Sequence, residues 1–296
     1  MRGSVETLAR YYPELQDRSF DTVMALCHAR YSTNTVSNFE RAQPFALLGH
    51  NGEINTINQF RKEAEQIGIQ LPKGGSDSQD VDRALEAFCI QFGLSLTEAM
   101  EIVFPPSPNE IDQLPTPLRE IYTRLTQAFG PFAQGPAAIG ARYGDVAVCS
   151  LDMLGLRPLW FSETEKEYIF SSERGAIQLE DMVKDSRPLA PGEKMGLSIT
   201  RGRGVEVLSH HDIRHQVMNA VLQREALLIN FSTAKSGPYH PSAPVQNQQI
   251  QQNQQKAQQK QGQAVLLENT SDNARVLFSL VPEREKIAWN QRQNHS

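Results

Sequence analysis

Residues 46–56 read ALLGHNGEINT, and this stretch can be interpreted in two ways. An apolar run ends at Gly49, and the polar residues His50, Asn51 and Glu53 follow at once around Gly52. Asn-Gly is a common two-residue hairpin turn, because both residues tolerate a positive φ. The same pair could instead form an oxyanion hole, with an amide side chain and a backbone N–H directed at a developing negative charge. The stretch by itself leaves both interpretations open.

The composition of the chain limits the classes of protein that it can represent. Its 296 residues are enough for one large domain or two modest ones with a substantial core. Lys and Arg number 29 against 34 Asp and Glu, and this net charge of -5 argues against a nucleic-acid partner. No run of about 18 apolar residues occurs, and no apolar signal-peptide segment opens the sequence. We therefore expect a soluble cytoplasmic protein without a membrane partner.

The sequence divides into three parts that differ in composition. Residues 1–234 predict a mixed domain with strands within 22–32 and 45–50, helices at 76–93, 116–130 and 213–230, and hairpins within 136–171 and 190–208. Residues 235–263 are rich in glutamine and contain almost nothing apolar, which predicts a disordered linker. The remaining residues, 264–296, are too few for an independent core, and we expect a poorly defined tail.

Two further polar motifs could bind a ligand. In HARYSTNT, residues 28–35, Arg30 follows a strand and could bind a carboxylate, with the hydroxyl of Thr33 beside it. The alternative is an exposed arginine at a strand end. In GGSDSQD, residues 74–80, Asp77 begins a predicted helix and could hold an ammonium group, or it could only stabilise the helix dipole.

The cysteines and histidines offer weaker candidates. Cys27 precedes His28, but adjacent strand residues point to opposite faces, so His28 is badly placed to activate this thiol. Cys27, Cys89 and Cys149 are far apart and lack CxxC spacing, which fits a reducing compartment. The histidines near position 210 have no acidic or cysteine ligand placed with them, so we expect no metal site.

In combination, these motifs resemble the glutamine amidotransferase domain of glutamate synthase. The resemblance covers roughly residues 3–215 and is carried by HARYSTNT, RAQPFALLGHNGEINTI and GGSDSQD, with ARYYPELQD, LDMLGLRP and SSERGAI in support. The DxxGxRPL pattern from Asp152 to Leu159 is similar to a stretch shared more widely among class II amidotransferases. The fold that this resemblance implies is α+β: a four-layer α/β/β/α sandwich with antiparallel sheets, like that of N-terminal-nucleophile hydrolases.

The resemblance also implies roles for the candidate residues. Arg30 would bind the α-carboxylate of L-glutamine with Thr33 alongside, and Asp77 would bind its α-ammonium group. Asn51 and Gly52 would stabilise the oxyanion formed when the side-chain amide is attacked. The implied reaction is hydrolysis of L-glutamine to glutamate and ammonia, for glutamate biosynthesis.

The sequence departs from the family pattern at its start. The family's nucleophile is an N-terminal cysteine whose own α-amine serves as base, whereas this sequence opens MRGSVETLARYYPEL. We therefore expect a domain that is incomplete at its N-terminus, inactive alone and dependent on a synthase-domain or complementary amidotransferase polypeptide. FMN and iron–sulfur clusters would belong to synthase regions, so we expect no cofactor in this chain. The alternatives are a non-catalytic subunit for glutamine binding or assembly, and an amidotransferase domain that supplies another acceptor.

Overall fold

The computed structural model describes residues 5–17, 19–29, 38–129, 132–200, 202–234 and 275–280. The chain separates into two compact units, one formed by residues 1–220 with 273–296 and the other by residues 221–272. The described part of the second unit is the C-terminal portion of helix α7 (His210–Ala234). All the elements below that position the candidate residues lie in the first unit.

One five-stranded sheet, called sheet B, is built from hairpins. Its order is β2-β3-β4-β8-β9, and every neighbouring pair is antiparallel. The strands are β2 (Leu48–Gly52), β3 (Ala137–Tyr143), β4 (Val146–Leu151), β8 (Lys194–Thr200) and β9 (Gly204–Leu208). The alternating patterns near 136–151 and 190–208 predicted the β3–β4 and β8–β9 hairpins, and both are confirmed. Strand β2 lies a few residues later than the predicted 45–50.

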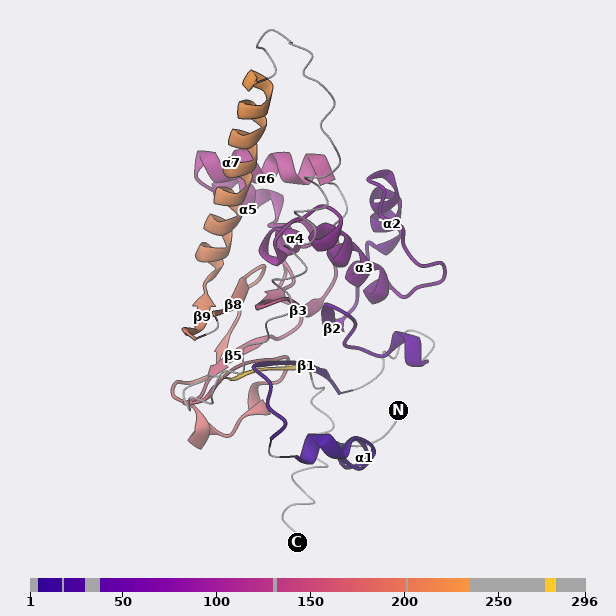
Figure 1. The fold of residues 1–296 in the computed structure, drawn as a ribbon, viewed down its shortest axis with the longest axis vertical. Coiled ribbons are helices and arrows are strands. Elements are labelled where there is room, and N and C mark those ends of the chain that lie inside the picture. The colour runs from indigo at the N-terminus through magenta and orange to yellow at the C-terminus, as the bar shows by residue number, and fades with distance from the viewer. Residues whose placement is uncertain are drawn as a thin grey trace, which may run out of the picture. The chain divides into compact units, whose positions relative to one another are not determined.

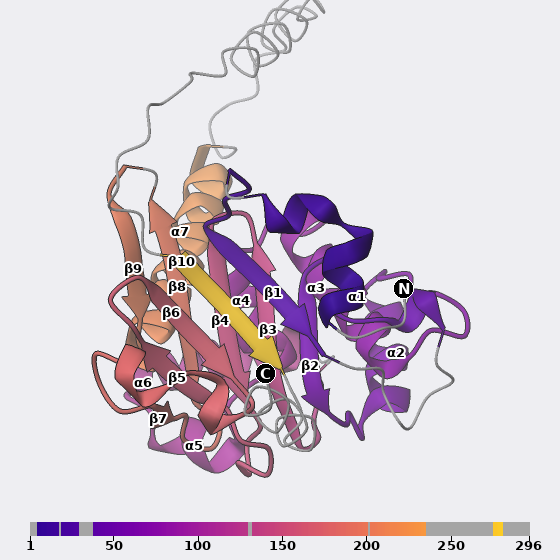
Figure 2. The ribbon, with the colours of Figure 1, turned by 90° about the horizontal axis from the view of Figure 1, so that it is seen from below.

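The second sheet, sheet A, has the order β1-β10-β6-β5-β7. Its strands are β1 (Met24–His28), β5 (Trp160–Glu163), β6 (Glu167–Ser171), β7 (Arg187–Pro188) and β10 (Arg275–Leu280). The predicted β5–β6 hairpin is confirmed. Strand β10 pairs in parallel with both β1 and β6, so this sheet is mixed, whereas the sequence predicted antiparallel sheets (Figure 2). One strand of sheet A, β10, comes from residues 264–296, where the sequence predicted a poorly defined tail.

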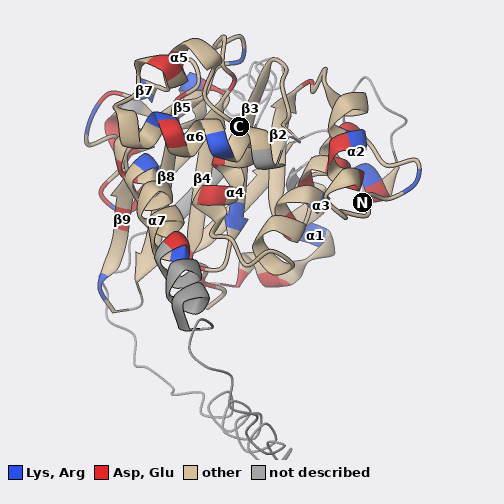
Figure 3. Ribbon diagram, turned by 90° about the horizontal axis from the view of Figure 1, so that it is seen from above, with Lys and Arg blue, Asp and Glu red and all other residues tan. Residues whose placement is uncertain are grey.

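Helices cover the face of sheet B that points away from sheet A, as Figure 1 shows. They are α2 (Ile57–Gln66), α3 (Asp77–Ile90), α4 (Leu96–Val103), α5 (Pro108–Gln113), α6 (Thr116–Phe129) and the first part of α7. Helix α3 begins where the sequence predicted, because Ser76 and Gln79 form a reciprocal capping box. Figure 3 shows acidic and basic residues of this helical face interspersed. None of the described helices is long and apolar enough to cross a lipid bilayer.

Helix α1 (Val5–Tyr11) lies beyond sheet A, on the side opposite to sheet B (Figure 1). The order of layers is therefore α/β/β/α, which confirms the predicted α+β class. Short 3-10 turns at Pro13–Gln16, Phe39–Arg41, Arg174–Ala176 and Leu179–Asp181 complete the described elements.

Two apolar cores hold these layers together. The larger core lies between sheet B and the helices, where Phe60, Phe88 and Met100 pack against Leu48 and Ile139. The second core includes Ala138 and Cys149 from sheet B with Leu159 and Phe170 from the β5–β6 region of sheet A. Because alternate residues of a strand face opposite sides, β3 contributes Ile139 to one core and Ala138 to the other. The strand that ends in Asn51 and Gly52 lies between these two cores.

A buried ion pair joins the helical layer to sheet B. Lys194 Nζ on β8 lies 3.3 Å from Glu101 Oε1 on α4, and the side chains are only 2% and 0% exposed. Either ion alone would be a buried charge without a partner, which is strongly destabilising. Loss of either partner is therefore expected to weaken the packing of α4 against β8.

Candidate functional site

Asn51 and Gly52 are the last two residues of β2 and do not form a two-residue turn. They pair with Ala138 and Ala137 of β3, which are distant in the sequence. The hairpin-turn interpretation of this Asn-Gly pair is therefore wrong, because the chain continues antiparallel to β3: Glu53 N donates to Pro136 O at 3.0 Å. The pair lies at the end of a strand in the sheet, where side chains are held by neighbours on both faces.

Gly52 is required by the close approach of the two strands at this point. Its φ is +142°, a backbone conformation that residues with a Cβ rarely adopt. A Cβ built on Gly52 would lie 1.9 Å from the carbonyl oxygen of Pro136 and 2.8 Å from Cα of Ala137. Both obstacles are backbone atoms, so no side-chain rotation could relieve the clash. The glycine thus fixes the path of the backbone beside Asn51.

The side-chain amide of Asn51 is held at both ends by residues from sheet A and the loop that precedes it. Arg157 Nη2 donates to Asn51 Oδ1, and Asn51 Nδ2 donates to Ser172 Oγ at 3.1 Å. Arginine has no acceptor, so the oxygen of the amide must face Arg157 and the NH₂ group must face Ser172. Arg157 and Ser172 belong to the motifs LDMLGLRP and SSERGAI, but the sequence predicted no role for either residue.

The loop that carries Arg157 is closed by the carboxylate of Asp152. Asp152 accepts hydrogen bonds from the backbone N–H groups of Leu154, Leu156 and Arg157 at 3.1, 3.0 and 3.0 Å. Its backbone oxygen also accepts from the N–H of Gly155. These hydrogen bonds explain the DxxGxRPL motif in structural terms. Asp152 fixes the conformation of the loop, and the loop places Arg157 against Asn51.

Helix α3 begins at Asp77 and is tied to the start of β2. Asp82, one and a half turns further along α3, accepts from the backbone N–H groups of Leu47 and Leu48, both at 2.9 Å, and so ties the helix to the strand. Asp77 itself is half-buried in the first turn and accepts from Ser78 N at 2.8 Å. Its negative charge acts on the ring of His50. Asp77 therefore begins a helix that is hydrogen-bonded to the start of β2, and its charge acts on a residue of that strand.

His50 is a buried, neutral support of this strand. Its backbone N–H donates to Gln43 Oε1 at 2.7 Å, and the Gln43 amide nitrogen lies 3.1 Å from His50 Nδ1. Burial lowers the pKa of His50 to about 4, although the charge of Asp77 acts in the opposite direction. The carbonyl of His50 is 3.0 Å from His28 Nε2 on β1. His28 thus connects the two sheets, and its ring is engaged away from Cys27.

The low pKa of His50 predicts a loss of stability in mild acid. The unfolded state takes up a proton near pH 6.5, whereas the folded state resists protonation until about pH 4. Stability therefore falls as the pH is lowered from 6.5 towards 4, by about 2 kcal/mol between pH 7.5 and 5 from this group. Urea unfolding at several pH values should show this slope, and His50→Gln should remove it.

A matched variant, His211→Gln, controls for the loss of a histidine. The side chain of His211 is 79% exposed. This variant should keep the wild-type dependence of unfolding free energy on pH. A His50→Gln protein with the same pH dependence as wild type would contradict the neutral state of His50.

The three cysteines lack the features of an activated nucleophile. Partial removal from water raises the pKa of Cys27, although this residue is exposed at the surface, and burial raises the pKa of Cys89 to about 11 and that of Cys149 well above its usual value. Each thiol is therefore protonated near neutral pH, and a protonated thiol attacks poorly. Within the described ranges, no group of three or more His, Cys, Asp or Glu residues is arranged to hold a metal ion.

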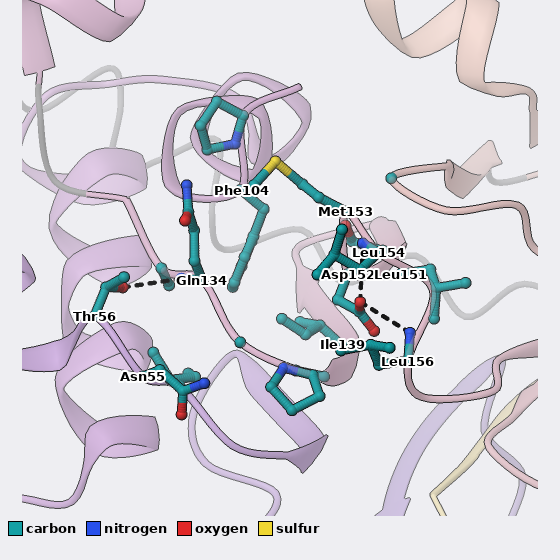
Figure 4. Close-up of a pocket in the computed structure, with 18 of the residues that line it drawn as sticks. Asn55, Thr56, Phe104, Gln134, Ile139, Leu151, Asp152, Met153, Leu154 and Leu156 are labelled. Carbon is teal, nitrogen blue, oxygen red and sulfur yellow. Dashed lines mark hydrogen bonds between the residues drawn. The ribbon is translucent and has the colours of Figure 1, made fainter. Parts of the chain in front are cut away.

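A cavity of about 250 Å³ lies behind the strand, on the face of sheet B that the helices cover. Ala137 and Ile139 contribute to its wall, together with Phe104 and the loop around Asp152 (Figure 4). The side chain of Asn51 contacts Ser172 of sheet A and so points to the other face of sheet B. The cavity and the amide of Asn51 are therefore separated by the sheet.

Two of the predicted binding residues, Arg30 and Thr33, lie outside the described residues. Asn51 and Gly52 end β2, whereas Asp77 begins helix α3 and its charge acts on the ring of His50; their roles in binding stay predictions. The contacts that the motifs did not reveal are those of Arg157 and Ser172, because they join positions far apart in the sequence.

Comparison with known proteins identifies a family for this chain. The family described as glutamine amidotransferases class-II matches residues 3–225. The large chain of the NADPH glutamate synthase of Bacillus subtilis is 33% identical over 230 residues, which are 72% of this chain and 15% of that protein. Ferredoxin-dependent glutamate synthase 2 of Synechocystis is 28% identical over 258 residues, 78% of this chain and 16% of that protein.

The match to these relatives is partial in length. This chain spans less than a fifth of each of them. Among solved structures, the glutamine phosphoribosylpyrophosphate amidotransferase of B. subtilis, complexed with ADP and GMP, aligns with a TM-score of 0.39 and 18% identity, over 62% of this chain and 34% of that one. The family match covers most of the chain. The chain therefore belongs to the class-II glutamine amidotransferases, and it resembles the amidotransferase domain of glutamate synthases.

Proposed function

We propose that this domain binds L-glutamine and stabilises the oxyanion formed during its hydrolysis to glutamate and ammonia, for glutamate synthesis. The observation that carries the proposal is the fixed amide of Asn51, whose NH₂ group is turned away from Arg157 and towards Ser172. A preorganised donor of this kind stabilises negative charge without having to reorient during the reaction. Membership of the family and the glutamate synthases among its relatives support this choice of substrate and product.

The charged ends of glutamine have complementary partners in the proposed site. Asp77 would bind the α-ammonium group, and the action of its charge on the ring of His50 supports this choice. Arg30 would bind the α-carboxylate, with Thr33 adding a hydrogen bond. The substrate amide would then lie against Asn51 and Gly52, where Nδ2–H of Asn51 and a backbone N–H would donate to the tetrahedral oxygen.

The nucleophile in this proposal is an N-terminal cysteine of the kind that the family uses. The family uses an N-terminal cysteine whose α-amine accepts the thiol proton, and the nitrogens of Cys27, Cys89 and Cys149 are peptide nitrogens that cannot act as bases. The partner would thus be a polypeptide that presents such a cysteine, or a synthase domain that contains it. The reaction requires no metal or cofactor from this chain, so FMN and iron–sulfur clusters are assigned to synthase regions.

The test is to supply an N-terminal cysteine as nucleophile. The purified chain should bind L-glutamine in a calorimetric titration without releasing ammonia. Addition of an amidotransferase segment with cysteine as its first residue should restore release of glutamate and ammonia. Binding without restored hydrolysis would favour a non-catalytic glutamine-binding subunit, and absence of both would refute the proposal.

In the restored enzyme, Asn51→Ala is expected to lower kcat by about 10²- to 10³-fold, because one oxyanion donor is lost. Asp77→Asn should mainly raise KM, because the ammonium contact is present in both ground and transition states. Steady-state kinetics with glutamine measure both effects. Asn55→Ala is the matched control, since Asn55 is an exposed residue that lines the cavity on the other face. A change in KM alone for Asn51→Ala would contradict the oxyanion role.

A further inference from the structure

The hydrogen bond between Arg157 and Asn51 has a consequence for the chemistry of the amide. An asparagine side chain can present either its oxygen or its NH₂ group to a ligand, and the two orientations have similar shapes. Only the NH₂ group can donate to an oxyanion, whereas the oxygen would repel it. An oxyanion donor therefore needs a second residue that selects one orientation.

Arg157 has the properties of such a residue. Its guanidinium has donors and no acceptor and donates to Asn51 Oδ1, so the oxygen of the amide is held on this side. Ser172 Oγ accepts one N–H of Asn51, and Ser172 is only 1% exposed. An amide nitrogen carries two N–H groups, so this arrangement leaves the second directed away from Arg157 and usable by a ligand.

The charge of Arg157 also strengthens the donor. A hydrogen bond from a cation to the amide oxygen draws electron density from the nitrogen, which makes the N–H groups better donors. The positive charge is felt in this region, because it contributes to lowering the pKa of His50. Arg157 is held by its own loop, where its backbone N–H donates to Asp152 Oδ2 at 3.0 Å.

We propose that Arg157 is a positioning residue that orients and polarises the Asn51 amide, and that the loop closed by Asp152 holds Arg157 in the position required for this. This proposal rests on the oxyanion role of Asn51 proposed above. Arg157 acts through Asn51 and does not contact the reacting atoms. The 152–159 motif is thereby connected with catalysis through a hydrogen bond between residues that are distant in the sequence.

The first experiment requires no turnover. The ¹H–¹⁵N signals of the Asn51 side-chain amide, identified by their absence in Asn51→Asp, are recorded in the folded chain. Arg157→Met should shift these signals and abolish their protection from hydrogen exchange. Arg157→Lys, which keeps a charged donor, should preserve part of the protection. Arg142→Met is the control, because Arg142 is an exposed arginine on β3.

The second experiment measures catalysis in the restored enzyme. Arg157→Met should lower kcat by up to about 10²-fold, as expected for a misplaced catalytic group, and should change KM little. Arg157→Lys should recover part of kcat. If thermal melting shows that Arg157→Met does not fold, Arg157→Gln replaces it, because glutamine is uncharged and too short to span the same distance.

The outcomes separate this proposal from the proposed function. Wild-type amide signals and exchange in folded Arg157→Met or Arg157→Gln would overturn the positioning role, as would a rise in KM with unchanged kcat. An enzyme that never hydrolyses glutamine would overturn the proposed function, and the amide signals would still decide whether Arg157 orients Asn51.

Discussion

Gly52→Ala is expected to destabilise the domain by at least about 3 kcal/mol, which corresponds to a fall in melting temperature of about 6–12 °C. The added methyl group would meet the carbonyl oxygen of Pro136 at 1.9 Å, and the φ of +142° would itself be strained. Relief requires that β2 separate from β3 at the position of Asn51. We therefore expect the restored glutaminase to lose its activity as well, because the oxyanion donors move with the backbone.

Gly144→Ala is the matched control for this substitution. Gly144 also has a positive φ, +58°, but a Cβ there would meet nothing within 4 Å. It should cost only about 1–2 kcal/mol, the ordinary strain of a left-handed residue. Thermal melting and urea unfolding of both variants measure the difference. Equal destabilisation of the two proteins would show that the contact with Pro136 does not constrain Gly52.

Lys194→Met is expected to destabilise the domain by about 3–5 kcal/mol, because it leaves the carboxylate of Glu101 buried without its cation. The two side chains are 2% and 0% exposed, so water cannot replace the lost partner without opening the interface between α4 and β8. The free energy of unfolding in urea measures this effect. The double variant Lys194→Met/Glu101→Leu should recover most of the loss, since no charge then remains buried.

The same substitution at a surface ion pair provides the comparison. Lys184 lies 3.5 Å from Glu163, but its side chain is 76% exposed. Lys184→Met should therefore change stability by less than about 1 kcal/mol. If Lys194→Met cost no more than Lys184→Met, the buried pair would not hold α4 against β8.

Local signals in the sequence predicted the elements that local physics controls. The period-two alternation around Gly144 gave the β3–β4 hairpin, and Ser76 with Gln79 gave the start of α3. The Asn51-Gly52 pair shows where this reasoning fails. Its local turn preference is overridden by pairing with Ala137 and Ala138, and nothing near Asn51 in the sequence reveals that partner.

The motif resemblance predicted roles for Asn51, Gly52 and Asp77, and the structure places the first two at the end of β2. The contacts that orient Asn51 were not predictable from spacing, since Arg157 and Ser172 come from a loop and a strand end beyond several intervening elements. The parallel pairing in sheet A was also not predictable from local patterns, because it requires a crossover between segments that are remote in the sequence.

The position of β10 between β1 and β6 in sheet A has a consequence for synthesis of the chain. Met24 of β1 pairs with Val276, and Tyr168 of β6 pairs with the same residue, so both strands emerge from the ribosome long before their shared neighbour exists. Closing such distant contacts has a large entropic cost and is a late step in folding. Nascent chains shorter than about residue 280 would therefore carry two open strand edges, which are sites of aggregation. Protection by chaperones during translation should matter more for this sheet than for sheet B, whose hairpins close as they are made.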